Sequence, residues 1–239
     1  MERLDKLLAS TGRWSRKEVK ELVRQGRVTA GGRQVLRPEE KFELQGGICV
    51  DGEPVCCQKF TWLMMNKPAG LLSATEDKRQ QTVLDLLPEH YQKQGLFPVG
   101  RLDKDTEGLL LLTNDGELAH RLLAPKSHVD KVYLARVAGR VEQADIAAFA
   151  QGMLLDDGLE CMPAGLEPLG DGSSCLVTLR EGKFHQVKRM LAFRGKPVEY
   201  LKRLSMGPLK LDEALAPGQW RELTAGEVEA LGRAESDGN

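Results

Sequence analysis

The chain has 239 residues, of which 41% are hydrophobic and 29% are charged, and its formal net charge is −1. This composition excludes a disordered chain and predicts a globular protein, with room for a small domain joined to a larger one. No apolar run approaches the roughly 20 residues that cross a bilayer, and the N-terminus lacks the features of a secretion signal. We therefore expect a cytoplasmic protein with no membrane partner.

The cysteines predict neither a disulfide framework nor a metal centre. There are five of them, an odd number, and none forms the Cys-x-x-Cys spacing of a zinc site. We expect reduced thiols, no metal and no cofactor.

Two short helices are the first elements that the sequence predicts. Leu4 and Leu7 lie at helical spacing in the first helix. Ser15 and Glu18 have the spacing of a capping box, in which each side chain bonds to the other residue's backbone, and they predict the start of a second helix that Gly26 ends. The apolar residues of this second helix share one face, and its cations share the other.

A small sheet and a connector follow these helices. Residues 28–30 and 34–36 predict a hairpin around a Gly-Gly turn, and residues 48–52 predict the strand that completes the sheet. Residues 53–60 have the character of a linker.

Two segments are strongly basic although the chain as a whole is nearly neutral. Residues 11–30 contain six cations and two acidic residues, and residues 182–203 contain seven cations and one acidic residue. Such local patches are typical of proteins that contact the nucleic-acid backbone. The alternative for either patch is an ordinary solvated face.

The N-terminal motifs resemble the S4 RNA-binding module. The resemblance covers residues 1–52 and rests on RLDKLL at residues 3–8, SRKE at 15–18 and QGRVT at 25–29. It implies that the basic second helix faces structured RNA, where cations neutralise phosphates with little sequence specificity. The residues expected to contact RNA are Arg3, Arg16, Lys17, Lys20, Arg24 and Arg27.

Short strands alternate with modest helices in the rest of the chain. Strands are predicted at residues 62–65, 109–113, 132–137 and 175–179, and helices at 117–123, 142–151 and 186–193. This order predicts an α+β fold, in which a small S4-like α/β module at residues 1–56 precedes a larger domain at 57–239. The larger domain is expected to have a mainly antiparallel sheet with flanking helices.

A polar loop at residues 100–108 leads into the most apolar predicted strand. Within it, Asp103 lies two residues after Arg101 and at the mouth of that strand, which is a plausible position for a functional carboxylate. The competing interpretation is structural, because aspartates in loops are usually caps or turn formers.

The segment at residues 100–116 resembles the signature of the RsuA-type pseudouridine synthases. Three further motifs match that family in the same order: MNKPAG at 65–70, KVYL at 131–134 and EGKFHQVKRM at 181–190. The resemblance covers nearly the whole chain, including the S4 module. It implies a pseudouridine-synthase domain in which Asp103 is the essential catalytic carboxylate.

The same resemblance implies roles for four other residues. Arg101 would hold the flipped nucleotide, Tyr133 would stack on the target uracil, and Lys188 would pair with Asp103. Lys67 is expected to contact a phosphate near the site or to belong only to a turn. His120 and His185 are assigned no catalytic role, because lone histidines are more often structural.

Pseudouridine formation suits these residue types. The bond between ribose C1′ and N1 breaks and a bond between C1′ and C5 forms, after the uridine has left its stack. A carboxylate near C1′ can be a nucleophile, a base or an electrostatic support, and a neighbouring cation keeps it ionised. The sequence leaves these three routes open.

Three hypotheses for function remain. The favoured one is a synthase acting as a monomer on 16S ribosomal RNA, in an assembling small ribosomal subunit, because HQVKRM at residues 185–190 resembles the small-subunit members. The alternatives are a large-subunit ribosomal RNA synthase and a non-catalytic S4-type RNA-binding assembly factor. Asp103 separates the enzyme from the binder, since a binder has no need of an acid there.

Overall fold

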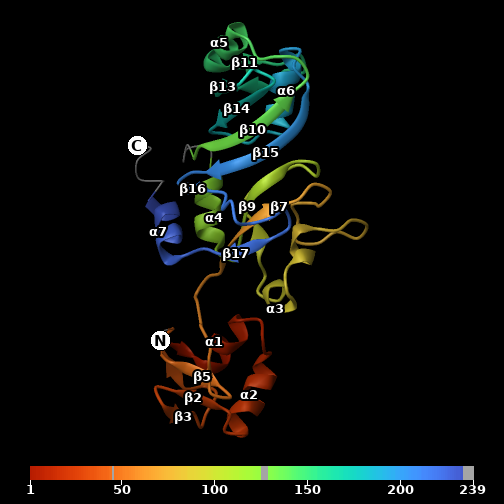
Figure 1. The fold of residues 1–239 in the computed structure, drawn as a ribbon. Helices are drawn as coiled ribbons and strands as arrows, with labels where there is room; N and C mark the ends of the chain where they lie inside the picture. The colour runs from red at the N-terminus through yellow and green to blue at the C-terminus, as the bar shows by residue number, and fades with distance from the viewer. Residues whose placement is uncertain (45, 125–128, 234–239) are drawn as a thin grey trace. The chain divides into compact units, whose positions relative to one another are not determined.

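The computed structural model describes residues 1–44, 46–124 and 129–233. Close contacts divide the chain into two compact units, whose elements are labelled in Figure 1. The first consists of Met1–Thr61 with Leu84–Phe97, and the second of Trp62–Val83 with Pro98–Asn239. The domain boundary predicted after residue 56 stays a prediction, since the first unit also takes in a segment from later in the chain.

The helices of the first unit begin where the sequence indicates. They are α1 (Leu4–Ser10) and α2 (Arg16–Arg24). The predicted capping box is present, because the Glu18 backbone N–H donates to Ser15 Oγ at 3.3 Å and the Ser15 N–H donates to Glu18 Oε2 at 2.6 Å. The two reciprocal bonds satisfy N–H groups that would otherwise lack partners at the helix start.

Short strands complete this unit. The predicted hairpin and third strand form a sheet in the order β3-β2-β5-β6. Its strands are β2 (Val28–Ala30), β3 (Arg33–Gln34), β5 (Ile48–Val50) and β6 (Glu53–Pro54), and a separate pair joins β1 (Glu2–Arg3) to β4 (Lys41–Phe42). Aliphatic side chains from α1, α2, β2 and β5 share one buried core.

The segment Leu84–Phe97, which contains α3 (Glu89–Gln92), packs against the turn between α1 and α2. Gly12 has a φ of +71°, and a Cβ there would lie 1.9 Å from the His90 carbonyl oxygen. Only glycine fits such a close approach in this backbone conformation. The Gln94 side chain adds a hydrogen bond to the Thr11 carbonyl oxygen at 2.9 Å.

A long mixed sheet forms the second unit. Its main path is β13-β14-β10-β15-β9-β7-β17, and every pairing is antiparallel except that of β15 with β9. The strands of this path are β7 (Trp62–Lys67), β9 (Glu107–Thr113), β10 (Lys131–Val137), β13 (Gly165–Leu169), β14 (Ser174–Leu179), β15 (Val198–Met206) and β17 (Trp220–Glu222). Two short strands lie off this path: β8 (Phe97–Pro98) pairs with β9, and β16 (Leu209–Lys210) pairs with β15.

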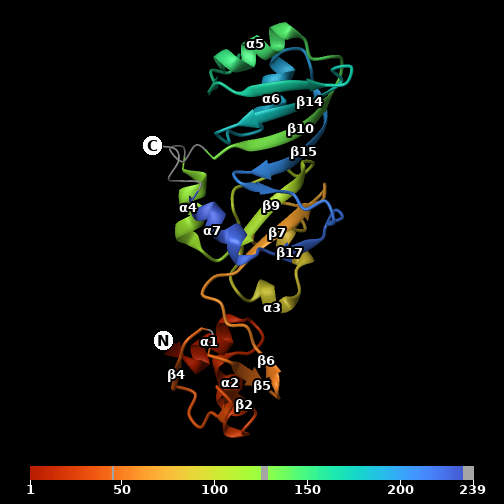
Figure 2. The ribbon, with the colours of Figure 1, turned by 60° about the vertical axis from the view of Figure 1, so that its left-hand side comes forward.

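Helices flank this sheet, as predicted. They are α4 (Gly116–Leu123), α5 (Gln143–Gln151), α6 (Gln186–Phe193) and α7 (Ala225–Arg233). Figures 1 and 2 show α4 and α7 side by side next to β9 and β7, while α5 contacts β13 and α6 contacts β15. Within the described residues, no helix is both long enough and apolar enough to cross a membrane.

The parallel contact between β15 and β9 depends on Gly108. This residue has a φ of +101°, and a Cβ there would lie 2.2 Å from the carbonyl oxygen of Arg203 on β15. Because glycine has no Cβ, the two strands can approach at the point where β9 begins. The loop that precedes β9 is thereby brought towards β15 and α6.

Candidate active site

The loop between β8 and β9 carries Asp103, and backbone-directed hydrogen bonds hold it on several sides. The Ser73 hydroxyl donates to the Leu102 carbonyl oxygen at 2.9 Å and accepts from the Leu102 N–H at 3.1 Å. The Gly70 N–H donates to the Lys104 carbonyl oxygen at 2.7 Å. The loop therefore has a fixed backbone, although it contains no regular secondary structure at Asp103.

Lys67, at the end of β7, supports this loop from inside. Its side chain is fully buried, and its Nζ lies 2.9–3.2 Å from the carbonyl oxygens of Pro68, Asp103, Lys104 and Thr106. Burial lowers the pKa of Lys67 to about 8, against the raising effect of the nearby carboxylates. The sequence-based expectation of a phosphate contact needs correction, because the ammonium group is enclosed by protein and bonded to the loop.

Asp103 lies between two basic side chains at the start of α6. Its Oδ2 is 3.1 Å from Lys188 Nζ, and its Oδ1 is 3.4 Å from His185 Nε2. The Asp103 side chain keeps 22% of its exposure, so it is sheltered but reachable. The pairing predicted between Lys188 and Asp103 is thus present in the geometry.

Lys188 also holds a second carboxylate of the loop. Its Nζ donates to Asp105 Oδ1 at 2.5 Å. Burial alone would lower the pKa of Lys188, but the bonds to Asp105 and Asp103 outweigh it and raise that pKa. The bond to Lys188 likewise lowers the pKa of Asp105. The site therefore keeps its cation charged across the neutral pH range.

His185 is the neighbour of Asp103 that the sequence did not indicate. It caps α6 in the left-handed conformation, with a φ of 52°, which is uncommon for residues other than glycine. Its ring stacks on that of Phe184, with centroids 3.8 Å apart and planes inclined by 19°. No local pattern indicates this contact, because His185 and Asp103 are distant along the chain.

Tyr133 and Arg101 differ in their surroundings. Tyr133 is a nearly buried residue of β10 and lies opposite Arg203 of β15, which in turn pairs with Gly108 at the start of β9. No hydrogen bond or ring contact joins Tyr133 to Asp103 in the described part of the chain. Arg101 is exposed, and among the described residues it makes no hydrogen bond or ion pair, so its guanidinium is free for a ligand.

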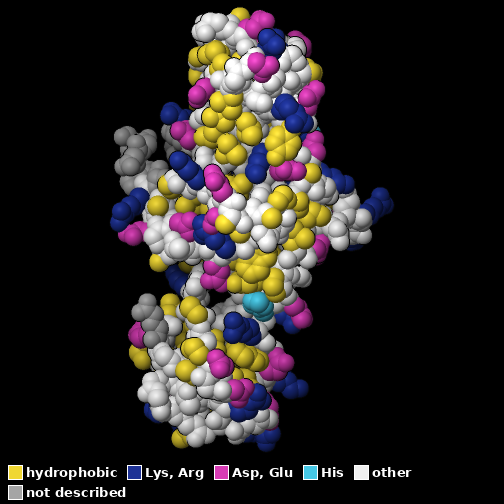
Figure 3. Space-filling model, in the orientation of Figure 1, with side chains coloured by type: hydrophobic (Ala, Val, Ile, Leu, Met, Phe, Trp, Pro, Cys, Tyr) yellow, Lys and Arg dark blue, Asp and Glu magenta, His cyan; other side chains and the backbone are white. Residues whose placement is uncertain are grey.

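The six cations expected to contact RNA fall into two groups. Three are held by carboxylates at 2.6–2.8 Å: Arg3 by Asp5, Arg24 by Glu21 and Arg27 by Asp51. The other three, Arg16, Lys17 and Lys20, are exposed on α2 and make no hydrogen bond or ion pair with any described residue. Figure 3 shows acidic side chains interspersed with basic ones on the visible face of this unit.

Known protein families match both parts of the chain. Residues 61–193 match the family model described as RNA pseudouridylate synthase, and residues 2–43 match the S4 domain. The chain belongs to the RNA pseudouridine synthase family. Its N-terminal motifs form an S4 domain, and the predicted α+β fold is confirmed.

Individual relatives cover this synthase from end to end. A Bacillus subtilis protein named as an uncharacterized RNA pseudouridine synthase, YtzG, is 49% identical over 98% of this chain and 100% of its own length. A Pseudomonas aeruginosa protein named ribosomal small subunit pseudouridine synthase A is 39% identical over 95% of this chain and 98% of its own. A crystal structure of a pseudouridylate synthase superposes with a TM-score of 0.68, at 36% identity over 97% of this chain and 100% of that one.

The synthase fold assembles its basic and acidic groups from separate segments. Asp103 lies in the loop before β9, and Lys67 lies at the end of β7. Lys188 lies in α6, and His185 is the N-cap residue of that helix. In the described part of the chain, no group of three or more His, Cys, Asp or Glu side chains is arranged to hold a metal ion. The arrangement places a partly exposed carboxylate, that of Asp103, next to the Lys188 cation.

Proposed function

We propose that this synthase isomerises a specific uridine of 16S ribosomal RNA to pseudouridine, with Asp103 as the essential acid. The reaction breaks the bond from C1′ to N1, turns the base and forms a bond from C1′ to C5. The C5 proton leaves and N1 gains a proton, so no oxidant or reductant is consumed.

The contact between Asp103 and Lys188 carries the assignment. A carboxylate can act at C1′ or on a ribose proton only while it is ionised. Lys188, at 3.1 Å, places a positive charge beside the Asp103 carboxylate, where it balances the negative charge when a flipped uridine displaces water from the site. The loop bonds to Lys67 fix the backbone of Asp103, and such fixing favours a reactive geometry.

The other residues take supporting roles in this proposal. Arg101 is free and exposed beside the site, which suits a contact with the phosphate of the flipped nucleotide. Tyr133 is proposed to stack on the target uracil from β10, where a base could recover about 1–3 kcal/mol of stacking energy. Lys67 acts through the loop and touches no substrate.

Two observations support the small-subunit target. Relatives of Pseudomonas aeruginosa and Vibrio cholerae, 39% and 40% identical, are both named ribosomal small subunit pseudouridine synthase A. The motif HQVKRM at residues 185–190 resembles the small-subunit members of the family, and it includes His185 and Lys188, which contact the Asp103 carboxylate. We propose that the substrate is the RNA of an assembling small subunit and that the enzyme acts as a monomer.

Tritium release tests the proposal directly. Transcribed 16S and 23S RNA carrying tritium at uridine C5 are incubated with the protein, and released label is counted. Release from 16S RNA alone is expected, and a partly assembled subunit should react faster than naked RNA. Release from 23S RNA alone would instead support a large-subunit synthase.

The Asp103→Asn variant separates chemistry from binding. It removes the charge and preserves the shape, so we expect it to bind RNA normally and to release no label. Turnover within tenfold of the unaltered protein would overturn the role given to Asp103. Absence of release by the unaltered protein from every ribosomal RNA, with binding intact, would overturn ribosomal RNA as the substrate.

A further inference from the structure

An exposed aromatic surface lies beside Asp103. Phe184 lies in the loop before α6, two residues from its start, and its side chain is 67% exposed. It stacks on His185, whose Nε2 is 3.4 Å from Asp103 Oδ1. The Phe184 ring is therefore separated from the acid by one side chain. Because this exposed ring stacks on a side chain that contacts Asp103, it is available to a ligand that occupies the site.

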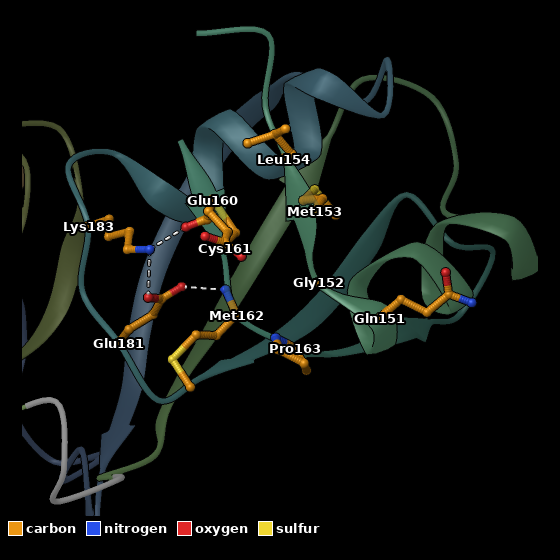
Figure 4. A pocket seen from close by; sticks show the side chains of 10 residues that line it. All are labelled: Gln151, Gly152, Met153, Leu154, Glu160, Cys161, Met162, Pro163, Glu181 and Lys183. Carbon is orange, nitrogen blue, oxygen red and sulfur yellow. Dashed lines mark hydrogen bonds and ion pairs between the residues drawn. The ribbon is translucent and has the colours of Figure 1, made fainter. Parts of the chain in front are cut away.

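The backbone that carries Phe184 is held firmly. Glu181 and Lys183 precede Phe184 in the chain, and Figure 4 shows both hydrogen-bonded to the segment around β12 (Glu160–Cys161). Glu181 Oε1 accepts from the Met162 N–H at 2.8 Å, and Lys183 Nζ donates to the Glu160 carbonyl oxygen.

The first residue of α6, Gln186, also bonds to Glu181 and Lys183. The buried Gln186 side chain donates to Glu181 Oε1 at 2.5 Å and accepts from the Lys183 N–H at 3.1 Å. Phe184 thus extends from a loop that is pinned on both sides. A surface that is already ordered loses little conformational entropy when a ligand binds to it.

The surroundings of Phe184 indicate the kind of ligand. Lys183, Lys188 and Arg189 lie within five residues of it along the chain, and Arg189 Nη1 contacts the Phe184 carbonyl oxygen at 3.5 Å. Each of these cations also pairs with a carboxylate: Lys183 with Glu181, Lys188 with Asp103 and Arg189 with Asp157. The exposed aromatic face is therefore the feature that indicates a nucleobase as the ligand. When a uridine is flipped out, its neighbours lose a stacking partner, and an aromatic side chain can replace that partner.

We propose that Phe184, stacked on His185, is a platform for the base of the nucleotide adjacent to the target uridine. The ligand class is a single unpaired nucleotide of RNA, bound by stacking and with little sequence preference. This inference rests on the proposed function, because it takes the nucleotide at Asp103 to be the target uridine.

Substitution at Phe184 gives the first test, with an RNA hairpin that the unaltered protein modifies as substrate. Phe184→Ala should lower kcat/KM by about 5- to 150-fold, the range that corresponds to stacking of one base. Phe184→Trp should restore most of the loss, whereas Phe184→Leu should not. Phe193→Ala is the matched control, since Phe193 is a 42% exposed phenylalanine at the other end of α6.

A fluorescent base gives a second test that needs no turnover. 2-Aminopurine is placed in turn at the 5′ neighbour, the 3′ neighbour and a position four nucleotides away, and the RNA is bound to the Asp103→Asn variant. Quenching at one neighbour that disappears in the Asp103→Asn/Phe184→Ala double variant supports the platform. Quenching only at the distant position, or quenching that survives the loss of Phe184, overturns it.

An abasic nucleotide completes the design. Removing the base of the stacked neighbour should lower kcat/KM of the unaltered protein as much as Phe184→Ala does, with no further loss when both changes are combined. Equal rates for Phe184→Ala, Phe193→Ala and the unaltered protein would overturn the platform while leaving the synthase activity established. Absence of synthase activity in the unaltered protein would count against the proposed function instead.

Discussion

The basic face of α2 and the loop around Asp103 use charge in opposite ways. On α2, the side chains of Arg16, Lys17 and Lys20 are exposed and make no hydrogen bond or ion pair with the described residues. Around Asp103, Lys188 contacts the carboxylate at 3.1 Å, and Lys67 is bonded to four carbonyl groups, three of them in the loop. The cations of α2 are exposed, whereas Lys67 and Lys188 are each held by several protein groups.

The difference suits the roles that we propose for the two regions. Phosphates repeat along RNA, and contacts with them gain affinity through counterion release with little demand on geometry. A reacting C1′ atom occupies a single place, and a misplacement of about 1 Å can cost 100-fold in rate. Variants should therefore have large effects on turnover in the loop and small effects on binding in α2.

The largest effect is expected for Lys67→Met. Four carbonyl groups lose a donor, although those of Asp103 and Lys104 keep a backbone N–H partner. Each group left unsatisfied costs about 1–3 kcal/mol, and relief of the buried charge offsets part of that cost. We expect the free energy of unfolding to fall by about 2–4 kcal/mol and kcat to fall at least about 100-fold. Urea denaturation and single-turnover tritium release measure the two changes.

Lys131→Met is the matched control for Lys67→Met. Lys131 is also a buried lysine with a pKa lowered by burial to about 8, but its Nζ bonds to the Val129 carbonyl oxygen, outside the loop. Lys131→Met should lower the free energy of unfolding less than Lys67→Met does, and it should leave kcat nearly unchanged. Equal losses of kcat in both variants would mean that Lys67 acts through general stability and not through the loop.

Lys188→Gln should have the next largest effect. The substitution removes the cation at 3.1 Å from Asp103 while it keeps a polar group there. Loss of one such electrostatic contact lowers kcat by about 100-fold, whereas RNA affinity should change by less than about threefold. Lys188→Arg should retain more activity than Lys188→Gln, and an unchanged kcat in Lys188→Gln would contradict the pairing.

These residues also show what sequence could and could not predict. The helix that begins after Ser15 was predicted correctly, because capping determines its start. Lys188 lies 3.1 Å from Asp103, as the motifs implied, and the roles of both residues stay predictions. Lys67 was expected to contact a phosphate or to belong only to a turn, and its full burial was not predicted, because lysines are rarely buried in full. Its burial depends on carbonyl groups almost 40 residues away, which no local pattern reveals.

The strands that escaped prediction have a similar explanation. β15 is a strand in the interior of the sheet but contains Lys202 and Arg203, and β13 contains Pro168. Alternation of apolar and polar residues is the signal for a strand, and these residues blur it. The contact of His185 with Asp103 is likewise tertiary, so motif spacing could not indicate it.

Alkaline pH should move activity and stability in opposite directions. Lys67 and Lys131 have a pKa near 8 in the folded chain and near 10.5 when unfolded. Between pH 8 and pH 9 the unfolded chain holds more protons, so the free energy of unfolding rises by about 1 kcal/mol for each lysine. Turnover should fall over the same range, because a neutral Lys67 amine has two N–H donors for four carbonyls instead of three.

Cys57 and Cys175 act in the opposite sense, increasingly so above pH 9. Burial raises the pKa of each thiol from 9 to about 11, so the folded chain holds the extra protons there and part of the gain from the two lysines is offset. Profiles of kcat and of urea midpoints between pH 7.5 and pH 9 measure both trends. A parallel decline of stability and activity between pH 8 and pH 9 would contradict the role given to Lys67.

The smallest effect separates free from paired cations on α2. Lys20→Ala removes a free cation, so the slope of log K against log salt should become shallower by about 0.7–0.9, as one phosphate contact is lost. The double variant Glu21→Ala/Arg24→Ala removes an ion pair at 2.6 Å without changing the net charge. Because Arg24 already has Glu21 as its partner, this double variant should leave the slope nearly unchanged. Filter binding of the Asp103→Asn background between 50 and 200 mM salt distinguishes the two. A slope change as large for the ion pair as for Lys20 would show that RNA takes Arg24 from Glu21, and both kinds of cation would then count as contacts.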